Sequence, residues 1–302
     1  LLSMSEQAVE RGRGSYDLLI IREAIEQATI RLQTAGVEGP RREAWLLLAH
    51  MCQQDRVTLL AHARDPIEQD DWSSFQELVR RRAAREPLAQ IVGRKEFWSL
   101  DFAITSDVLC PRPDSEALIE AALAELGRRC NISGWPGRVL DFGTGSGCLL
   151  LALLSELPAA FGVGIDISQQ ALSVAEANGR SLGLADRVSW LRGDWGAALH
   201  GHFDLIISNP PYISHCEAEA LAPEIREFEP EAALFGGDDG LVAYRALSLD
   251  LERLLALDGL ICLEVGFGQA DAVETSLAAA GFKTVDRHQD LAGIDRCLIA
   301  RR

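Results

Sequence analysis

The sequence predicts an α/β protein: a doubly wound sheet of seven strands, preceded by a small helical domain and a β-hairpin linker. Two observations predict this fold. Beyond Gly137, apolar segments of strand length alternate with segments of helical period, which is the pattern of a parallel sheet with helices on both faces. Before residue 88, apolar residues recur at steps of three and four, which indicates helices alone.

The N-terminal helical domain is predicted over residues 1–87. Its helices are predicted at 17–36, 41–52 and 70–85. In the first helix Ile25, Ala28 and Leu32 fall on one face, as expected for a helix that buries one side. Residues 88–113 contain short β-like segments that end at a Pro-Arg-Pro sequence, and they predict the hairpin linker.

The third domain is predicted over residues 114–302, and it begins with a helix over 114–126 that Asp114 caps. Strands are predicted at 138–142, 161–165, 187–191, 203–208, 259–265, 282–288 and 296–300. Further helices are predicted at 147–157, 168–182, 239–256 and 269–280. In a doubly wound sheet of order 3-2-1-4-5, the segments that follow the first and fourth strands face each other across one crevice, where ligands bind.

Composition restricts the class of protein. No segment approaches the roughly 18 consecutive apolar residues that a membrane span needs, and the N-terminus lacks the apolar core of a signal peptide. The seven cysteines are scattered and never form Cys-x-x-Cys, which argues against a disulfide framework and a structural zinc site. We therefore expect a cytoplasmic protein that binds no membrane and no metal.

The net charge of −16 is unevenly distributed. Residues 1–95 carry 14 basic and 14 acidic side chains, so residues 96–302 carry the whole excess of acid. Nucleic-acid binding depends on Lys and Arg that neutralise phosphates, so we expect no nucleic-acid partner. A basic protein partner fits this half of the chain better. The one basic cluster, Arg80-Arg81-Arg82 with Arg85, is interpreted as a solvated helix face.

The segment Phe203–Ile213 is a short apolar run that ends in Asn209-Pro210-Pro211-Tyr212. Two consecutive prolines cannot continue a strand, because each lacks an N–H and has a fixed φ. The turn then presents an amide side chain, the Pro210 carbonyl and an aromatic ring. These groups can accept hydrogen bonds from a planar NH₂ group and cover one of its faces. The alternative is a strand-ending turn with a capping asparagine.

A glycine-rich turn follows the first predicted strand. Glycines at alternate positions let the backbone turn sharply and approach a ligand closely. The pattern is Gly-x-Gly-x-Gly with an acid two residues before it, which favours S-adenosylmethionine over a dinucleotide, whose pattern is Gly-x-Gly-x-x-Gly. The acid can hold a cationic amino-acid ligand, through water. The expected cofactor-binding residues of this turn are Asp141, Gly143, Thr144, Gly145 and Gly147.

Two further acids follow the next two strands. Asp166 ends the second strand, about twenty residues beyond the glycines, where a carboxylate can accept two ribose hydroxyls; Ile167 follows it. Asp194 and Trp195 follow the third strand, where an adenine ring could be hydrogen-bonded and flanked by an apolar group. A helix-capping aspartate is the alternative for Asp194. Asn209 is expected to touch the cofactor as well as the substrate.

At these residues the sequence resembles the class I S-adenosylmethionine-dependent methyltransferases, and Asn-Pro-Pro-Tyr marks those that methylate planar NH₂ nitrogens. Over about residues 17–302 it is similar to the peptide chain release factor glutamine methyltransferases, the PrmC/HemK family. The segments that carry the resemblance are PRPDSE (111–116), DFGTGSG (141–147), SNPPYI (208–213), REFEPEAALFGGDDGL (226–241), LEVG (263–266) and GIDRCLIAR (293–301). Two small departures are Ser115, where the family usually has Thr, and Cys110, where an aliphatic residue is common.

The resemblance implies a Rossmann-like methyltransferase sheet with an N-terminal substrate-recognition domain. It implies methyl transfer from S-adenosylmethionine to the side-chain amide nitrogen of the glutamine in the Gly-Gly-Gln loop of release factors. Asn209 and Pro210 would each accept one N–H of that amide, Tyr212 would pack on it, and Pro211 would keep the turn rigid. A monomer is expected on the same ground.

The resemblance also implies residues around the substrate. Arg112, Pro113 and Glu116 are expected to close over the site, and Glu229 to line the substrate channel. Glu264, at the end of the fifth predicted strand, is interpreted as structural rather than as part of the pocket.

Two other functions remain open from the sequence. The same turn could hold an exocyclic amine of adenine or guanine in a flipped or unpaired base, but this function predicts a basic channel that the acidic half does not offer. The chain could instead be a cofactor-binding module without activity, which the intact asparagine turn and glycine turn disfavour.

Overall fold

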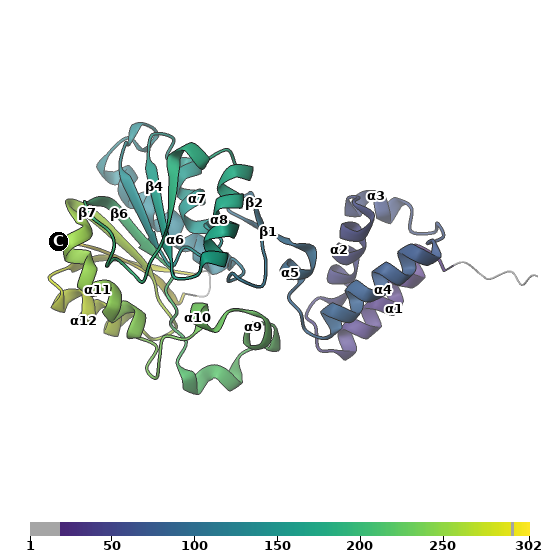
Figure 1. Ribbon diagram of the computed structural model, residues 1–302. Helices are drawn as coiled ribbons and strands as arrows, with labels where there is room; N and C mark the ends of the chain where they lie inside the picture. The colour runs from purple at the N-terminus through teal and green to yellow at the C-terminus, as the bar shows by residue number, and fades with distance from the viewer. Residues whose placement is uncertain (1–18, 291–292) are drawn as a thin grey trace, which may run out of the picture. The chain divides into compact units, whose positions relative to one another are not determined.

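The computed structural model describes residues 19–290 and 293–302. The expected start of the first helix at residue 17 lies outside the described residues. The chain divides into two compact units between Val92 and Gly93 (Figure 1). The three-part division expected from the sequence, with boundaries at residues 87 and 113, stays a prediction.

The first unit is a helical bundle. Its helices are α1 Ile21–Thr34, α2 Pro40–Cys52, α3 Arg56–Ala61, α4 Gln69–Ala83 and α5 Leu88–Val92. The three long helices, α1, α2 and α4, pack against one another around buried side chains such as Ile25, Leu48 and Phe75. The short helix α5 lies where a β-like segment was expected; this prediction was wrong, because the five residues after Pro87 close a helical turn instead.

The arginine cluster of α4 is tied into the first unit. Arg82 is only 5% exposed, and its Nε atom donates to Glu43 Oε2 of α2 at 2.5 Å. Arg80 forms an exposed ion pair with Glu77 one helical turn earlier, at 2.7 Å. The interpretation of this cluster as a solvated helix face was therefore wrong for Arg82, which links two helices of the bundle.

The second unit opens with an antiparallel hairpin, β1 Arg94–Phe97 and β2 Leu100–Ala103. Its two turn residues, Trp98 and Ser99, both have positive φ, as the tight hairpin turn that matches strand twist requires. Glu116 Oε1 accepts the Trp98 backbone N–H at 2.9 Å. Glu116 therefore holds this turn, and its expected closure over the site stays a prediction.

A 3₁₀ turn, Pro113–Ser115, leads into α6 Glu116–Arg129. Asp114 lies inside this turn, before the helix begins, so the expected capping of the helix by Asp114 was wrong. Its carboxylate lies instead 3.6 Å from the Arg296 guanidinium.

Seven strands form the sheet of the second unit, in the order β5-β4-β3-β6-β7-β9-β8. They are β3 Arg138–Phe142, β4 Phe161–Asp166, β5 Val188–Arg192, β6 Phe203–Ser208, β7 Leu255–Glu264, β8 Lys283–Gln289 and β9 Asp295–Arg301. The first five are parallel, in the expected order, and β9 runs antiparallel between β7 and β8. A parallel sheet throughout was expected, and this was wrong for the last strand. Parallel neighbours need a long crossover, and the sequence between β8 and β9 is too short for one.

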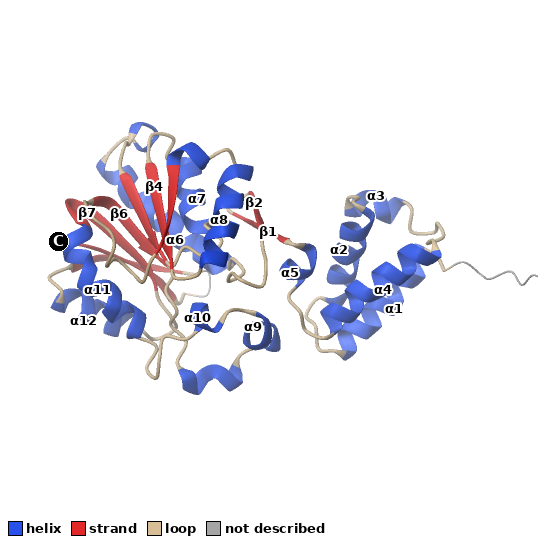
Figure 2. Ribbon diagram, in the orientation of Figure 1, coloured by secondary structure: helices blue, strands red, loops and turns tan. Residues whose placement is uncertain are grey.

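Helices cover both faces of this sheet (Figure 2). Helices α6, α7 Cys148–Glu156 and α8 Gln169–Ser181 pack on one face. Helices α11 Val242–Leu254 and α12 Ala270–Ala279 pack on the other, over a core that includes Phe142, Ile206 and Tyr244. Between β6 and α11 the chain forms a 3₁₀ turn, His215–Ala220, and two short helices, α9 Pro223–Phe228 and α10 Glu231–Leu234. Within the described ranges, none of the helices has the length and apolar character needed to cross a membrane.

Candidate active site

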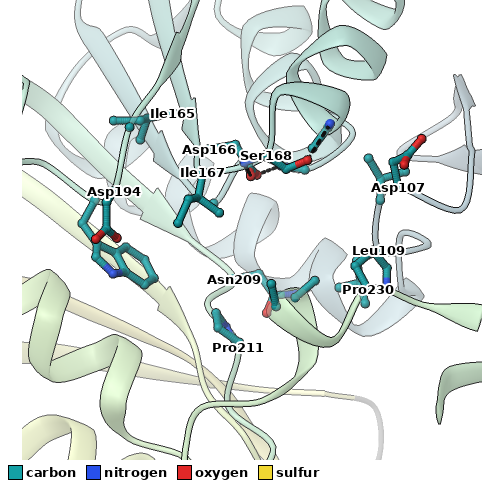
Figure 3. A pocket seen from close by; sticks show the side chains of 18 residues that line it. Asp107, Leu109, Ile165, Asp166, Ile167, Ser168, Asp194, Asn209, Pro211 and Pro230 are labelled. Carbon is teal, nitrogen blue, oxygen red and sulfur yellow. Dashed lines mark hydrogen bonds between the residues drawn. The ribbon is translucent and has the colours of Figure 1, made fainter. Parts of the chain in front are cut away.

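A cavity of about 260 Å³ lies outside the carboxyl ends of β3, β4, β5 and β6. This is close to the lower end of small-ligand pockets, roughly 300–1,000 Å³. Four successive strand ends contribute to its wall: Gly143 and Gly145, Asp166 and Ile167, Asp194 and Trp195, Asn209 and Pro211. Figure 3 shows the labelled residues of these strand ends around one opening, with Leu109 and Pro230 on a further side. The topology therefore brings the two sequence signals together in one cavity.

The glycine turn after β3 adopts a conformation that other residues disfavour. Gly143 and Gly145 have φ of 66° and 55°. A Cβ atom at Gly143 would meet no described heavy atom within 4 Å, so the space beside the turn is open to a ligand. The Gly145 N–H donates to Asp166 Oδ2 at 2.9 Å, which ties the turn to the end of β4.

Besides Asp141, described below, two predicted cofactor residues of this turn do not line the cavity. Gly147 immediately precedes α7, and a Cβ there would lie 2.9 Å from the Trp190 ring, so glycine allows the helix to pack against β5. Thr144 is buried, and its hydroxyl donates to Asp141 Oδ2 at 2.6 Å. Both residues shape the turn, and their contact with the cofactor stays a prediction.

Asp141 is the last but one residue of β3, and it is 1% exposed. Its Oδ1 atom is buried and finds no hydrogen-bond partner within the described residues. Burial raises the pKa of Asp141 to about 7. The side chain does not line the cavity, and its expected contact with a cationic ligand through water stays a prediction. A buried carboxylate of this kind is stabilised by a nearby positive charge.

The acid at the end of β4 has a structural role and keeps capacity to accept further hydrogen bonds. Asp166 accepts the Gly145 N–H on one oxygen and the Ser168 N–H, at 2.9 Å, on the other. Each carboxylate oxygen can accept a second hydrogen bond, so ribose hydroxyls can still bind. Ile167, which is 58% exposed, offers an apolar side chain to the cavity.

The turn after β5 supplies a polar and an aromatic side chain. Asp194 is exposed at the cavity wall, and Trp195 is half-buried with its ring packed against Phe142, 6.3 Å between centroids. Together with Asp166, this wall offers acids at two strand ends and an apolar surface between them, and the buried Asp141 adds a third acid outside the wall. S-adenosylmethionine fits this donor set: a cationic amino-acid part, two hydroxyls and an adenine ring.

The turn after β6 is held from three sides. Asn209 Nδ2 donates to Ser115 Oγ at 3.1 Å, which leaves Asn209 Oδ1 for other partners. The Tyr212 carbonyl accepts Gln269 Nε2 at 2.9 Å, and the Tyr212 hydroxyl lies 3.4 Å from Glu264 Oε1. Burial raises the pKa of Tyr212, so its hydroxyl stays protonated. Pro210 is buried and Pro211 lines the cavity.

Arg112 and Glu229 meet across 117 positions of sequence. Arg112 Nη2 donates to Glu229 Oε2 at 2.5 Å, and the Glu229 side chain is 1% exposed. Burial raises the pKa of Glu229, and the Arg112 charge opposes that rise. This ion pair anchors the segment that carries α10, whose Ala232 and Ala233 line the cavity. The expected contacts of Arg112 and Glu229 with substrate stay predictions.

Sequence reasoning missed several residues of the cavity wall. Asp107, Val108 and Leu109 line it from the segment after the hairpin, and Ala232 and Ala233 line it from α10. The available signal was their position just before the PRPDSE segment or within the EPEAAL segment. Within the part of the chain that the structure describes, His, Cys, Asp and Glu side chains form no cluster of three that could hold a metal ion.

Two family models match the chain. The PrmC N-terminal domain matches residues 23–93, and the methyltransferase small domain matches residues 123–256. The chain is 44% identical to the release factor glutamine methyltransferase of Rhodospirillum rubrum over 284 residues, which is 94% of this chain and 86% of the relative. The chain belongs to the release factor glutamine methyltransferase family. A second relative of that name, from Cereibacter sphaeroides, is 44% identical over 92% of this chain and 97% of its own length.

A solved structure agrees with the fold of this family. A methyltransferase from Pyrococcus furiosus superimposes with a TM-score of 0.52, covers 73% of this chain and 97% of its own, and is 16% identical. The expected Rossmann-like methyltransferase sheet is confirmed. As a release factor glutamine methyltransferase by family, the protein is an enzyme, and S-adenosylmethionine is its methyl donor.

Proposed function

We propose that this enzyme methylates the side-chain amide nitrogen of the glutamine in the Gly-Gly-Gln loop of peptide chain release factors. One observation supports the proposal above all others. Asn209 lines the same cavity as the glycine turn and Asp166. An acceptor for a planar NH₂ group therefore lies beside the residues that suit S-adenosylmethionine. The similarity of this chain to the release factor glutamine methyltransferases extends over most of this chain and most of each relative.

Positioning carries most of the catalysis in this proposal. A carboxamide nitrogen is a weak nucleophile, because its lone pair is delocalised into the carbonyl, so orientation has to supply a large share of the rate. When bound, S-adenosylmethionine supplies an electrophilic methyl group on a sulfonium. Asn209 Oδ1 and the Pro210 carbonyl each accept one N–H of the substrate amide and thereby aim its nitrogen at the methyl group. Tyr212 packs against the plane of the amide.

The same two acceptors stabilise the transition state. Positive charge builds on the substrate nitrogen as the methyl group arrives, and preorganised acceptors on both N–H groups stabilise that charge. Charge is moved rather than created, so the apolar part of the cavity wall costs the reaction little. The proton leaves the nitrogen late, to water or to a nearby carbonyl.

The partners and location of the enzyme are part of this proposal. All seven cysteines are free thiols, which suits a reducing cytoplasm. The substrate is a protein rather than a nucleic acid, because residues 96–302 carry the whole net negative charge. We take the enzyme to act as a monomer, with its first unit contributing to substrate recognition.

The test is a labelling experiment with S-adenosylmethionine that carries a labelled methyl group. The purified enzyme is offered a release factor, the same factor with the loop glutamine changed, DNA and RNA. We expect label on the unchanged factor alone. Label on the glutamine-free factor would reject the amide as the acceptor, and label on nucleic acid would favour a base-modifying enzyme instead.

A further inference from the structure

Glu264 is a buried carboxyl for which the reaction described above gives no role. It is the last residue of β7 and is 3% exposed. Its Oε1 atom is 3.4 Å from the Tyr212 hydroxyl, which donates to it. Its Oε2 atom is buried and has no hydrogen-bond partner in the part of the chain that the structure describes. A buried oxygen of this kind calls for a donor nearby.

Ser115 offers a donor beside this carboxyl. The Ser115 hydroxyl faces Glu264 closely enough to lower the pKa of that carboxyl. On its other side, Ser115 Oγ accepts the Asn209 Nδ2–H at 3.1 Å. A hydroxyl that accepts on its oxygen keeps one hydrogen to donate elsewhere. Ser115 thus stands between the buried carboxyl and the amide that orients the substrate.

The donor-to-acceptor direction of the hydrogen bonds that link Asn209, Ser115 and Glu264 decides which end of the Asn209 amide meets the substrate. With Nδ2 bonded to Ser115, Oδ1 is left to accept a substrate N–H. The opposite amide orientation would present Nδ2 to the substrate, and two donors would then face each other. Ser115 accepts from Asn209 Nδ2 without competition only when its own hydroxyl hydrogen is donated to an acceptor on its other side.

We propose that Ser115 and Glu264 are positioning residues: ionised Glu264 accepts hydrogens from Ser115 and Tyr212 and thereby fixes the Asn209 amide with its oxygen toward the substrate. The inference rests on the proposed function for the role of Asn209. Protonated Glu264 would donate to Ser115 instead. Ser115 would then donate to Asn209 Oδ1, and the amide would turn its nitrogen toward the substrate.

The surroundings of Glu264 place its ionisation in the working pH range. The titratable and charged groups that face it are Tyr212 after β6, Tyr244 of α11, Asp114 before α6, Cys148 of α7, and Arg296 and Cys297 of β9. Burial raises the pKa of Glu264 to about 7, and the Ser115 hydroxyl and the Arg296 charge oppose that rise. The carboxylate therefore forms as the pH rises through about 7, and kcat should rise with it.

The test compares Glu264→Gln with wild type at saturating S-adenosylmethionine, which keeps the ionisation of Asp141 from limiting the rate. The Tyr212 hydroxyl can donate only to the oxygen of the glutamine amide. The NH₂ group of the glutamine then faces Ser115 and donates to it, as the O–H of a protonated carboxyl would. We expect kcat to fall about 10-fold to 100-fold, less than the roughly 10²–10³ lost when a group that touches the transition state is removed. The pH dependence of kcat between about pH 6 and about pH 8 should disappear.

Two variants of Ser115 keep the test decisive if Glu264→Gln folds poorly. Ser115→Ala removes the hydroxyl and should lower kcat in the same way, whereas Ser115→Thr keeps it and should restore most of the rate. Ser208→Ala is the matched control, because it removes a buried hydroxyl that donates to the Phe142 carbonyl at 2.8 Å, one residue from Asn209. It should change thermal stability but leave the pH profile of kcat as in wild type.

Calorimetric titration with S-adenosylmethionine and thermal unfolding accompany the kinetics. Cofactor affinity within about two-fold of wild type, together with reduced kcat, supports positioning; equal losses in both would show a merely structural role. Wild-type kcat and pH profile in Glu264→Gln would overturn the inference. A wild-type enzyme that leaves the release factor unmethylated would instead reject the proposed function, so the two failures are distinct.

Discussion

Replacing Asp141 by asparagine should stabilise the cofactor-free enzyme and weaken its affinity for S-adenosylmethionine. The side chain is 1% exposed, and one carboxylate oxygen has no described hydrogen-bond partner. Burial raises its pKa from 3.8 to about 7, so the folded protein holds a charge there only at an energetic cost. A neutral side chain of the same shape removes that cost and also removes the attraction for a cationic ligand.

The magnitude follows from the pKa of Asp141, 3.8 in its ordinary state and about 7 in the fold. A tenfold change in an equilibrium constant corresponds to about 1.4 kcal/mol, so the ionised carboxylate costs about 4 kcal/mol above pH 7. The asparagine NH₂ group left without a partner would cost about 1–3 kcal/mol. We therefore expect a net stabilisation of about 1–3 kcal/mol in the Asp141→Asn variant at about pH 8.

The sign of the pH dependence is fixed by the same pKa values. Between about pH 4 and pH 7 the folded state keeps a proton that the unfolded state has released, so wild-type stability falls as the pH rises. The advantage of Asp141→Asn should therefore grow by about 2–3 kcal/mol between about pH 5 and about pH 8. Contributions from Glu264 are common to both proteins and cancel in the difference.

Thermal and urea unfolding without cofactor measure this difference, because bound ligand would itself add stability. Calorimetry at about pH 8 measures the affinity for S-adenosylmethionine, which should fall about 10-fold in Asp141→Asn. Asp194→Asn is the matched control: the same chemical change at an exposed acid of the cavity wall should shift stability by less than about 0.5 kcal/mol. A stability difference that stays constant from pH 5 to pH 8 would refute the reasoning.

Three further variants test the site and the fold. Asn209→Ala should lower kcat about 10²–10³-fold with little change in cofactor affinity; an equal loss of both would show that the residue serves the cofactor. Arg82→Ala should destabilise the first unit by about 1–3 kcal/mol, because it removes a buried side chain and leaves Glu43, whose side chain is 18% exposed, without this partner; unchanged cofactor affinity in calorimetry is the check. Gly147→Ala should lower the unfolding temperature, because φ is 80° and a Cβ meets the Trp190 ring at 2.9 Å; wild-type stability would mean that α7 adjusts freely.

Local signals predicted the centre of the site. The two prolines after Asn209 end β6 whatever its position in the sheet. The glycines after β3 have a backbone conformation that few other residues adopt. Strand order then followed from the alternation of strands and helices, so the two turns could be placed in one cavity. These features depend on a few neighbouring residues and are therefore visible in the sequence.

Features that depend on distant partners could not be predicted. The pairing of Arg112 with Glu229 joins segments 117 positions apart, and the neighbours of neither residue in the sequence indicate the other as its partner. The proposed role of Ser115 depends on its position between Asn209 and Glu264. These three residues come from three separate segments of the chain. The cluster around Arg82 was misread because a charged residue in a helix is usually solvated, and only the packing of α2 against α4 buries it.

The place of β9 in the sheet sets the order in which the second unit can be completed. This strand, Asp295–Arg301, lies between β7 and β8. β8 therefore joins the sheet only through its hydrogen bonds to β9, whose residues are synthesised after those of β8. A growing or truncated chain that stops before Asp295 leaves β7 with an open edge and β8 without a neighbour. Open edges of this kind recruit other chains. Loss of these few residues should therefore cause aggregation rather than a mild loss of activity.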